Sequence, residues 1–395
     1  MKVLFLTYDL PYPLISGGKI RAYYFLKNLS RNNQITLFSY YRREEQKQYL
    51  PELKKYCREI YLFKRRKPWS WQNLLRCFIT PLPFTAATYY SSSLKKALVK
   101  ELEKNKYDLV HFESFYPALY LPLAKKLGVK TLMGNENIEY QIYNRYADSK
   151  RFFLLRWLLK LEVFRMRLFE ERLWRQADVN LALSKDDAAI IKKVAKKHCF
   201  IIPNGVDPNA FKEVRDYRQG KTLIFIGTLI YQANNDAMKF FLKEIYPEIK
   251  KREKKVKFIL VSWYKPSWLE KYLTDPSIRF VQDRETPVNK LLSQRDILVA
   301  PIRVASGTNI KVLEAMAAGL PVVTTSAGIE GIEAVKNKEA VVGDSPQEFA
   351  EEVASLLEDK KRSQQLGQAG QALVKKRYDW SKISEKLGKV YQDLI

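Results

Sequence analysis

The fold is decided by one stretch of the sequence, Ile297-Leu-Val-Ala-Pro-Ile-Arg-Val-Ala-Ser-Gly-Thr-Asn-Ile-Lys-Val-Leu-Glu-Ala-Met-Ala-Ala-Gly-Leu-Pro-Val-Val-Thr-Thr325. Its apolar start, Ile297–Pro301, predicts a buried strand, and the residues after Asn309 predict a helix that ends at Gly319. Val322–Thr324 then predicts a second strand. A strand, a helix and another strand in this order form a βαβ unit, in which the two strands are parallel.

The same alternation of short apolar runs and helical stretches continues in both directions along the chain. We expect further strands at Lys2–Thr7, Ile35–Tyr40, Ile60–Phe63, Asp108–Phe112, Lys130–Met133, Val179–Leu183, Thr222–Gly227, Phe258–Ser262, Ile278–Val281 and Val341–Val342. We expect helices at Lys19–Asn28, Ser92–Lys104, Arg151–Arg175, Asp236–Lys250 and Lys375–Ile395. Repeated βαβ units predict an α/β fold with parallel sheets that helices cover on both faces. The polar stretch Gly205–Gly220 is the best candidate for a linker, so we predict two doubly wound domains, at 1–204 and 205–374.

The composition is that of a globular protein with a strong positive charge. Of its 395 residues, 46% are hydrophobic and 28% are charged, and no apolar run reaches the roughly 20 residues needed to cross a bilayer. Three widely spaced cysteines predict neither a disulfide framework nor a zinc site, so the reducing cytosol is the expected compartment. The net charge is +26, and residues 1–200 hold 38 of the 69 lysines and arginines but only 18 of the 43 acidic residues. Such an excess predicts an anionic partner: nucleic acid, an acidic membrane or a phosphorylated substrate.

The quoted stretch also holds the residues best suited to bind an anion. In parallel sheets, ligands bind beside the carboxyl ends of the strands, which is where Arg303–Asn309 is expected. The helix start offers free backbone N–H groups, and Arg303 and Lys311 add positive charge, which together suit a diphosphate. Glu314 lies on the same helical face as Lys311 and could accept hydrogen bonds from the two hydroxyls of a ribose. Taken singly, these residues could equally form an ordinary helix cap and a surface ion pair.

Three groups in the first half of the chain also follow predicted strands. Gly17 and Gly18 would let the backbone approach a phosphate or a sugar closely, although a plain turn explains them as well. His111 and Glu113 stand at the end of a strand, where either a binding residue or a structural residue is expected. Asn135-Glu-Asn137 follows the next strand and either binds hydroxyls or caps a helix.

Several of these motifs resemble those of one family in type and in order. The stretch Lys311-Val-Leu-Glu-Ala-Met-Ala-Ala-Gly-Leu-Pro-Val-Val-Thr-Thr325, with Gly328-Ile-Glu-Gly331, is similar to the donor-site signature of the retaining GT-B glycosyltransferases of family 4 (glycosyl transferases group 1). Pro203-Asn-Gly-Val-Asp207, Gly17-Gly18 and Tyr378-Asp-Trp380 resemble its other signatures. The resemblance is closest to exopolysaccharide-associated branches. It implies two Rossmann-like domains that face a central cleft, and a C-terminal helix, 375–395, that crosses back to the first domain.

The resemblance implies roles for individual residues. Glu314 matches the second Glu of the family's E-x7-E motif and should hold the nucleotide ribose, whereas Ser306 stands in the place of the first Glu. The family's Arg and Lys are missing from Gly227-Thr-Leu-Ile-Tyr-Gln-Ala-Asn-Asn235, so we expect Arg303 and Lys311 to supply their charge. The residues expected to bind the donor are Gly17, Gly18, Gly227, Thr228, Arg303, Ser306, Gly307, Thr308, Asn309, Lys311, Val312 and Glu314. The residues expected to act in catalysis are His111, Glu113, Arg303 and Lys311, and those expected to bind the acceptor are Lys19, Asn135, Glu136 and Asn137.

The resemblance also implies a reaction. A sugar would move from a nucleoside-diphosphate sugar to a glycan or lipid-linked acceptor, with retention of configuration, in the synthesis of a cell-surface polysaccharide. The chain lacks an Asp-x-Asp metal motif, so we expect neither a metal nor another cofactor. A sugar-nucleotide epimerase and a catalytically silent binding subunit would share the fold, and both stay open. Nucleic acid is not expected as a partner, because no recognition motif accompanies the positive charge.

Two basic segments rich in aromatic residues predict contact with a membrane. They are Lys64-Arg-Arg-Lys-Pro-Trp-Ser-Trp-Gln-Asn-Leu-Leu-Arg76 and Arg151-Phe-Phe-Leu-Leu-Arg-Trp-Leu-Leu-Lys-Leu-Glu-Val-Phe-Arg-Met-Arg167. Aromatic side chains suit the headgroup boundary, and cations suit anionic lipids. The alternatives are a solvated loop for the first segment and a core helix for the second. We therefore expect a cytoplasmic protein that is held peripherally on the inner face of the membrane.

Overall fold

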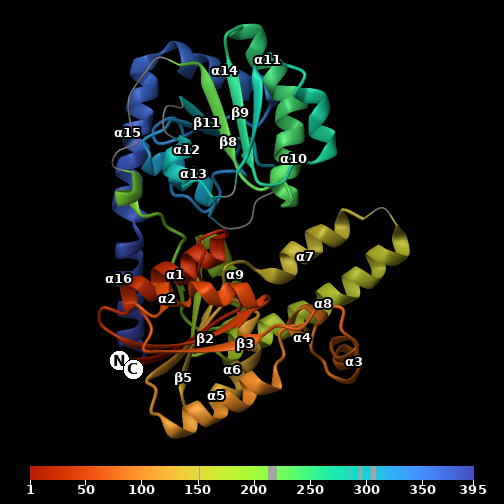
Figure 1. Cartoon of the computed structure of the whole chain (residues 1–395), viewed down its shortest axis with the longest axis vertical. Coiled ribbons are helices and arrows are strands. Elements are labelled where there is room, and N and C mark those ends of the chain that lie inside the picture. The colour runs from red at the N-terminus through yellow and green to blue at the C-terminus, as the bar shows by residue number, and fades with distance from the viewer. Residues whose placement is uncertain (151, 212–219, 284, 293–295, 304–307) are drawn as a thin grey trace. The chain divides into compact units, whose positions relative to one another are not determined.

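The computed structural model describes residues 1–150, 152–211, 220–283, 285–292, 296–303 and 308–395, which fold into two units (Figure 1). Unit 1 comprises Met1–Pro203 and Ile383–Ile395, and unit 2 comprises Asn204–Lys382. The sequence places the last border at 374/375, whereas the structure places it at 382/383. The reason is that residues 375–377 complete helix α15 (Lys360–Arg377) of unit 2. A separate helix, α16 (Trp380–Leu394), then leads into unit 1, so 375–395 is not one helix.

Unit 1 is built around a sheet of seven strands in the order β3-β2-β1-β4-β5-β6-β7, and all neighbouring strands pair in parallel. The strands are β1 (Lys2–Thr7), β2 (Gln34–Tyr41), β3 (Glu59–Lys64), β4 (Leu109–Glu113), β5 (Lys130–Gly134), β6 (Val179–Ala182) and β7 (Cys199–Ile201). Only β7 escapes prediction, because it is 3 residues long and directly follows a polar run. The strand order reverses between β1 and β4, and such a switch point is where ligands bind in open α/β sheets.

Unit 2 repeats this plan with six parallel strands in the order β10-β9-β8-β11-β12-β13. The strands are β8 (Thr222–Ile226), β9 (Lys257–Ser262), β10 (Ile278–Gln282), β11 (Ile297–Ala300), β12 (Val322–Thr324) and β13 (Val341–Val342). The sequence predicts each of them to within two residues. The switch point lies between β8 and β11, so the expected donor-site stretch starts at the strand that borders it.

The connections between strands are mostly helical. In unit 1 they are α1 (Gly17–Leu29), η1 (Glu44–Tyr49), α2 (Leu50–Leu53), α3 (Trp71–Ile79), α4 (Phe84–Ala87), α5 (Ser92–Lys104), η2 (Pro117–Tyr120), α6 (Leu121–Lys126), α7 (Glu139–Asp148), α8 (Phe153–Gln176) and α9 (Lys185–Ala195). In unit 2 they are η3 (Pro208–Phe211), α10 (Gln232–Phe240), η4 (Phe241–Ile245), α11 (Tyr246–Arg252), η5 (Ser267–Tyr272), α12 (Val288–Leu292), α13 (Ile310–Ala317), α14 (Pro346–Glu358) and α15. The single helix expected at Asp236–Lys250 is α10 and α11 joined by a π-helical turn, η4.

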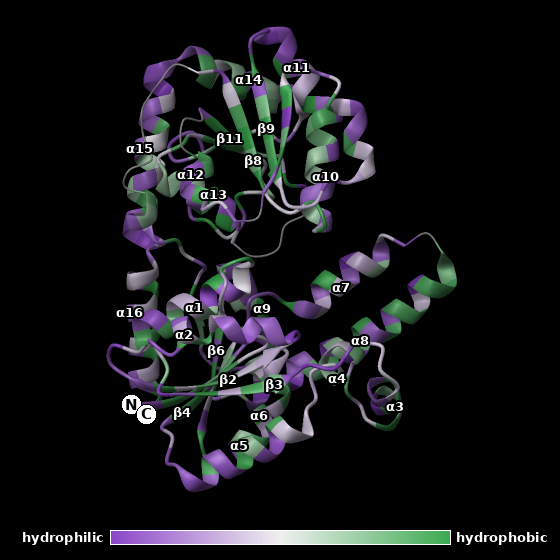
Figure 2. Cartoon of the chain, viewed as in Figure 1, coloured by the Kyte–Doolittle hydropathy of each residue, from purple (hydrophilic) through white to green (hydrophobic). Residues whose placement is uncertain are grey.

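Each unit has its own hydrophobic core between its sheet and its helices. In unit 1, α1 lies on one face of the sheet, and α5 and α6 lie on the other (Figure 1). The strands of both sheets are mainly hydrophobic (Figure 2), as expected for parallel strands that are buried on both faces. Cys57, Cys77 and Cys199 are free thiols. None of the described helices is both long enough and apolar enough to cross a membrane.

Candidate functional site

The candidate donor site lies at the carboxyl ends of β8 and β11, the two strands that flank the switch point of unit 2. Helix α10 follows β8 after the loop Gly227–Tyr231, and α13 follows β11. The first N–H groups of a helix have no acceptor within the helix and carry a partial positive charge. Because both helices begin at this edge of the sheet, their N-terminal N–H groups favour the binding of an anion there.

Lys311, in the first turn of α13, is the central cation of this edge. Its ammonium group donates to Asn234 Oδ1 at 3.0 Å and to Asn309 Oδ1 at 3.2 Å, and it lies 5.3 Å from the centroid of the Phe225 ring. Burial lowers the pKa of Lys311 to about 8, although the nearby charge of Glu314 acts in the opposite direction. Both hydrogen-bond partners are neutral amides, so the charge of Lys311 is held in place without being neutralised by them.

Glu314 lies one turn further along α13. Burial raises its pKa to about 7, and the charge of Lys311 lowers it in part. Within the described residues, no side chain or backbone group donates a hydrogen bond to its carboxylate. A partly buried carboxylate without donors is costly for the protein alone, and two ligand hydroxyls would satisfy it.

Asn234, which sequence reasoning missed, connects the parts of this site. Its Nδ2 donates to the carbonyl oxygen of Thr228 at 2.9 Å, while its Oδ1 accepts from Lys311. A Cβ on Gly227 would lie 2.8 Å from Asn234 Nδ2, so this close approach requires glycine. The available signal was the polar run Asn234-Asn-Asp236 directly behind a strand and at the start of a helix.

Arg303, in the loop after β11, contacts α10 and pairs there with the carboxylate of Asp236. Its Nε and one terminal nitrogen donate to the two oxygens of Asp236 at 3.0 and 2.6 Å, and its guanidinium lies 4.5 Å from the Phe240 centroid. Asp236, 67 residues away in sequence, raises the pKa of Arg303 and balances its charge. The expectation that Arg303 and Lys311 together face a diphosphate therefore needs correction, because in this structure only Lys311 is free of a hydrogen-bonded carboxylate.

The other residues of the stretch divide into three groups. Ser306 and Gly307 lie outside the described residues. Thr308 is 7% exposed, and its hydroxyl has no hydrogen-bond partner among the residues described. Asn309 stands at the N-cap position of α13, and its side-chain oxygen accepts from Lys311. Val312 was expected to bind the donor, but its side chain is buried in the core and its N–H already donates to Asn309, so this prediction is wrong.

His111 and Glu113, expected in catalysis, are instead sealed inside unit 1. Their side chains are 0% and 1% exposed, and His111 Nε2 lies 2.6 Å from Glu113 Oε2. Arg21 Nε donates to Glu113 Oε1 at 2.6 Å, and the hydroxyl of Tyr391 bonds to His111 Nδ1. A side chain with no solvent access cannot meet a substrate here. The catalytic expectation for both residues is corrected to a structural one.

The charges within this interior network are matched. Burial raises the pKa of Glu113, but Arg21 and His111 more than offset this effect, so the carboxyl stays ionised. Burial lowers the pKa of His111, which favours the neutral ring. A neutral ring with its proton on Nε2 faces the Glu113 carboxylate with that N–H and can accept at Nδ1 from the hydroxyl of Tyr391. Arg21 also donates to the carbonyl oxygen of Ile202, so the network joins α1, β4, α16 and the end of the first segment of unit 1.

The residues expected to bind the acceptor differ in burial and in their hydrogen-bond partners. Asn135 is buried, donates to Leu181 and accepts from the indole of Trp174, so it is structural rather than ligand-binding. Lys19 is buried and lies 3.4 Å from a carboxylate oxygen of Asp9. Glu136 and Asn137 are only partly buried.

Glu136 lies beside the start of α1, and one of its carboxylate oxygens is buried without a hydrogen-bond partner in the described chain. A Cβ on Gly18 would lie 2.6 Å from its carboxylate oxygens, so Gly18, near the start of α1, packs directly against this group. Burial raises the pKa of Glu136 to about 8, and the charge of Glu113 adds to this shift. Gly17 opens α1 beside it.

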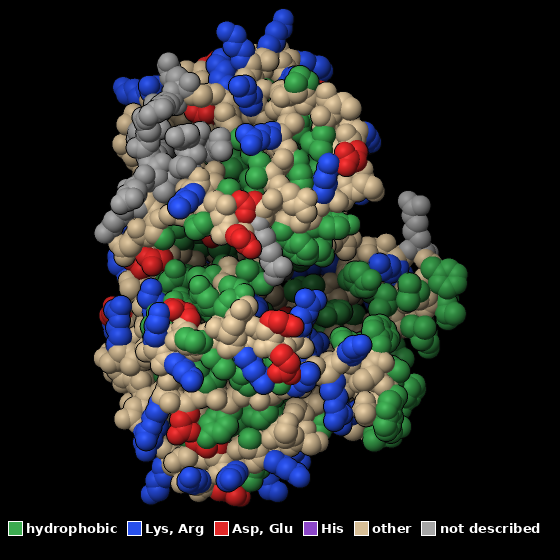
Figure 3. Space-filling model, in the orientation of Figure 1, with side chains coloured by type: hydrophobic (Ala, Val, Ile, Leu, Met, Phe, Trp, Pro, Cys, Tyr) green, Lys and Arg blue, Asp and Glu red, His purple; other side chains and the backbone are tan. Residues whose placement is uncertain are grey.

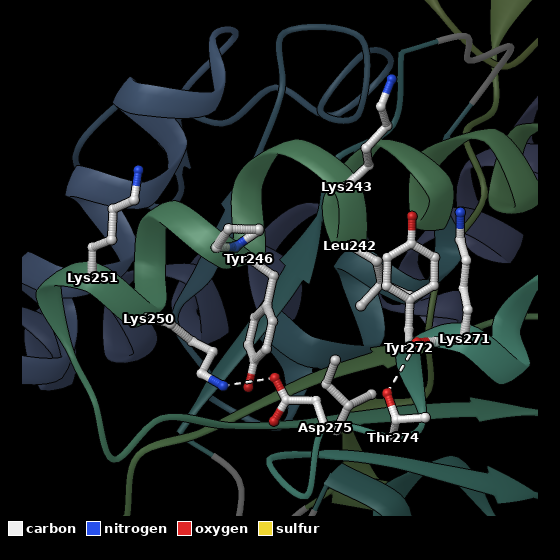
Figure 4. A pocket seen from close by; sticks show the side chains of 11 residues that line it. Leu242, Lys243, Tyr246, Lys250, Lys251, Lys271, Tyr272, Thr274 and Asp275 are labelled. Atoms are coloured by element: carbon white, nitrogen blue, oxygen red, sulfur yellow. Dashed lines mark hydrogen bonds and ion pairs between the residues drawn. The ribbon is translucent and has the colours of Figure 1, made fainter.

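A separate cavity of about 590 Å³ in unit 2 lies away from this site (Figure 4). Lysines line much of it, and Lys250 pairs with Asp275. Tyr246 in its wall bonds to Ser277, the residue before β10, so the cavity lies near the amino end of that strand. Since the candidate donor site is at the carboxyl ends, this cavity is not part of it. In the described part of the chain, no group of three or more His, Cys, Asp or Glu could hold a metal ion.

Two family models match the chain. The model described as Glycosyltransferase Family 4 matches residues 15–210, and the model described as Glycosyl transferases group 1 matches residues 220–359. The chain is a family 4 glycosyltransferase. The second match contains every residue of the candidate donor site, from Gly227 to Glu314.

Two curated relatives are distant from this glycosyltransferase. An uncharacterized 44.6 kDa protein in the cps region of Klebsiella pneumoniae is 21% identical over 402 residues, which cover 98% of the chain and 99% of the relative. Spore coat protein SA of Bacillus subtilis is 29% identical over 118 residues, which cover 29% of the chain and only 31% of that protein.

Solved structures share the fold of this glycosyltransferase over its whole length. Sucrose-phosphate synthase from Thermosynechococcus elongatus has a TM-score of 0.73 and 15% identity, covering 100% of this chain and 98% of that one. Anabaena Alr3699/HepE in complex with UDP-glucose has a TM-score of 0.67 and 16% identity, covering 100% of both chains. The predicted GT-B fold, with one parallel-sheet domain in each unit, is confirmed.

The buried network predicts that Glu113→Gln destabilises the glycosyltransferase. Removing the carboxylate charge leaves Arg21 buried without its counter-ion, which costs about 3–5 kcal/mol. Thermal melting of the full chain should therefore show a clear fall in the transition of unit 1. The control Glu44→Gln removes an exposed carboxylate of the same unit and should melt like the parent. A Glu113→Gln variant that melts like the parent but has lost sugar transfer would contradict the structural role.

Proposed function

We propose that this glycosyltransferase moves a sugar from a nucleoside-diphosphate sugar to a glycan or lipid-linked acceptor, with retention of configuration, in cell-surface polysaccharide synthesis. The observation that carries the donor assignment is the presence of two groups on α13 that a ligand could pair. Among the described residues, the ammonium of Lys311 donates only to neutral amides, and the carboxylate of Glu314 has no hydrogen-bond donor. A diphosphate next to a ribose supplies an anion for the first group and hydroxyls for the second.

The proposed nucleotide is UDP. The related structure of Alr3699/HepE contains UDP-glucose, and that protein shares the fold over the full length of both chains. The buried hydroxyl of Thr308 is a further group without a partner in the described chain, and it lies next to the helix start that would face the diphosphate. A UDP-linked hexose is therefore the first donor to test.

In the proposed mechanism, the protein stabilises the departing nucleotide. The bond between the anomeric carbon and the diphosphate oxygen breaks, and negative charge accumulates on the diphosphate. Lys311 and the N–H groups at the start of α13 are positioned to stabilise that charge. Asn234 and Asn309 keep the ammonium group in place, so little reorganisation is needed when the charge develops. We propose that no metal ion takes part.

The proposed acceptor and location follow from the relatives and from the charge of the first half of the chain. The Klebsiella relative is a protein of a cps region, which supports a role in polysaccharide synthesis. The excess of lysine and arginine in residues 1–200 supports an anionic membrane as partner and a peripheral position on its cytoplasmic face. Nucleic acid is not proposed as a partner.

A catalytically silent subunit that only binds the nucleotide sugar is the second candidate. It is favoured by the ion pair between Arg303 and Asp236, which occupies one of the two cations expected on the diphosphate. Ser306 in place of the first motif Glu points the same way. Release of UDP with and without membrane extract separates the candidates. A silent subunit releases none, and an epimerase releases UDP without acceptor.

Removal of either α13 group should weaken donor binding. Lys311→Ala and Glu314→Ala should each lower the affinity for UDP-glucose about 10- to 100-fold, since a hydrogen bond to a charged group contributes about 1.5–3 kcal/mol. A thermal-shift titration measures this. The matched controls are Lys271→Ala, at the other cavity, and Glu351→Ala, on α14, which should bind like the parent. Parent-like binding by both α13 variants would refute the site.

Donor binding should depend on pH in a bell shape. Lys311 is cationic below its pKa of about 8, and Glu314 is anionic above its pKa of about 7. Affinity for UDP should therefore peak between these values, fall on the acid side as Glu314 is protonated, and fall on the alkaline side as Lys311 loses its proton. Isothermal titration at several pH values tests this. In Lys311→Arg the alkaline fall should disappear, and its persistence would show that another group titrates.

Transfer should continue when divalent cations are removed. If Lys311 and the start of α13 meet the charge of the leaving group, excess EDTA should leave the rate of UDP release from UDP-glucose unchanged within about twofold. A coupled assay for UDP measures this in the presence of acceptor extract. Loss of activity with EDTA and its recovery with Mg²⁺ or Mn²⁺ would contradict the metal-independent mechanism.

A further inference from the structure

Helix α3 carries a stripe of large apolar side chains that no part of the described chain covers. Trp71, Leu74, Leu75, Phe78 and Ile79 follow the spacing of one helical face, and their exposed fractions lie between 37% and 88%. In a water-soluble helix this face would normally turn toward the core. Here the buried residue of α3 is Asn73, so the helix is inverted with respect to the core of unit 1.

The first half of α8 repeats this inversion. Phe153, Leu154, Trp157, Leu158 and Leu161 are between 49% and 79% exposed. The opposite face of the helix carries Val163 and Met166, which are buried against the protein. Helix α8 is therefore apolar on two faces, and only one of them is used for packing.

The two helices are held together although they lie far apart in sequence. One terminal nitrogen of Arg165, on α8, donates to the carbonyl oxygens of Cys77, Thr80 and Leu82 at the end of α3 and just beyond it, at 2.9, 3.1 and 2.7 Å. The carboxylate of Glu162 accepts from the N–H of Phe84. Figure 3 shows hydrophobic side chains gathered along the edge of unit 1 formed by these helices.

The surroundings of this apolar surface are strongly basic. Residues 64–76 contain five lysines and arginines and no acidic residue. Residues 150–167 contain six lysines and arginines and one acidic residue. Arg66 and Lys67 are exposed next to the start of α3. Several cations are themselves paired: Arg156 and Lys160 with Asp148, and Arg167 with Glu171. Arg66 and Lys67 have no carboxylate partner among the described residues. Exposed apolar side chains beside exposed cations match the acyl and headgroup layers of an anionic lipid surface.

We propose that α3 and the first half of α8, which we name the α3–α8 surface, insert their apolar faces into an anionic bilayer. The proposal deepens the membrane part of the proposed function and does not depend on the donor site. A second copy of the chain fits less well, because pairing through this surface would bring two strongly basic regions together. Arg165 holds the end of α3 beside α8 through its hydrogen bond to Cys77.

The test uses the full chain and vesicles of phosphatidylcholine with or without one third phosphatidylglycerol. The parent should sediment with the anionic vesicles, and high salt should weaken this binding. Phe78→Ser with Trp157→Ser, and separately Arg66→Glu with Lys67→Glu, should each reduce binding at least about tenfold. The matched controls in unit 2 are Val335→Ser, an apolar residue 58% exposed, and Lys360→Glu with Lys361→Glu, and these should bind like the parent.

A second measurement locates the contact. Lipids brominated in the acyl chain should quench the tryptophan fluorescence of the parent, and Trp71→Phe with Trp157→Phe should lose most of that quenching while still sedimenting. Three results would overturn the proposal: no binding of the parent to anionic vesicles, parent-like binding by the serine variant, or a dimer that the serine variant abolishes. A chain that is stabilised by UDP-glucose but ignores vesicles would refute the α3–α8 surface and leave the proposed transferase intact.

Discussion

An ion pair without solvent access, between Arg21 and Glu113, organises unit 1. It joins α1, the helix that follows β1, to the end of β4. Strands β1 and β4 are the two strands of the switch point. Through His111 it reaches Tyr391 on α16, and through the guanidinium it reaches the carbonyl oxygen of Ile202. Charges cost several kcal/mol to bury, so loss of either member of the ion pair would leave an uncompensated charge in the interior. Gly134 takes part as well, because a Cβ there would lie 2.7 Å from Glu113 Oε2.

The same topology in unit 2 is used in the opposite way. Both sheets reverse their strand order between the first and fourth strands, and both place an ionisable group at that point. In unit 1 the buried carboxylate of Glu113 accepts from Arg21 at Oε1 and lies 2.6 Å from His111 Nε2 at Oε2. In unit 2 the ammonium of Lys311 is held by neutral amides, and Glu314 stays without a donor in the described chain. A buried ion pair favours a rigid interior, whereas a cation held by amides and a carboxylate without a donor, both beside helix starts, can gain hydrogen bonds from a ligand. This contrast explains why the chemistry is proposed for the second unit.

Much of the fold could be predicted from the sequence, because buried parallel strands are continuous apolar runs and the helices between them end at recognisable residues. Position along the chain also located the helix with Lys311 and Glu314. Burial could not be predicted for His111 and Glu113, since a strand-end residue looks the same whether or not a distant helix such as α16 covers it. The pair of Arg303 with Asp236 spans 67 residues, and no local pattern reports it. Asn234 was present in the stretch examined for missing cations, but its role appears only when the strands bring it to Lys311.

The apolar stripes show a different limit of sequence reasoning. Periodicity reveals that α8 is apolar, but a helix with two apolar faces does not reveal which face meets the core. The structure resolves this through two polar groups of α8: Arg165 donates to Cys77 at the end of α3, and Glu162 accepts from Phe84 at the start of α4. Side chains that served only the hydrophobic core would be buried, whereas those of α3 and of the first half of α8 are exposed. The hydrogen bond from Arg165 to Cys77 thus holds the end of α3 beside α8, while large apolar side chains of both helices stay exposed.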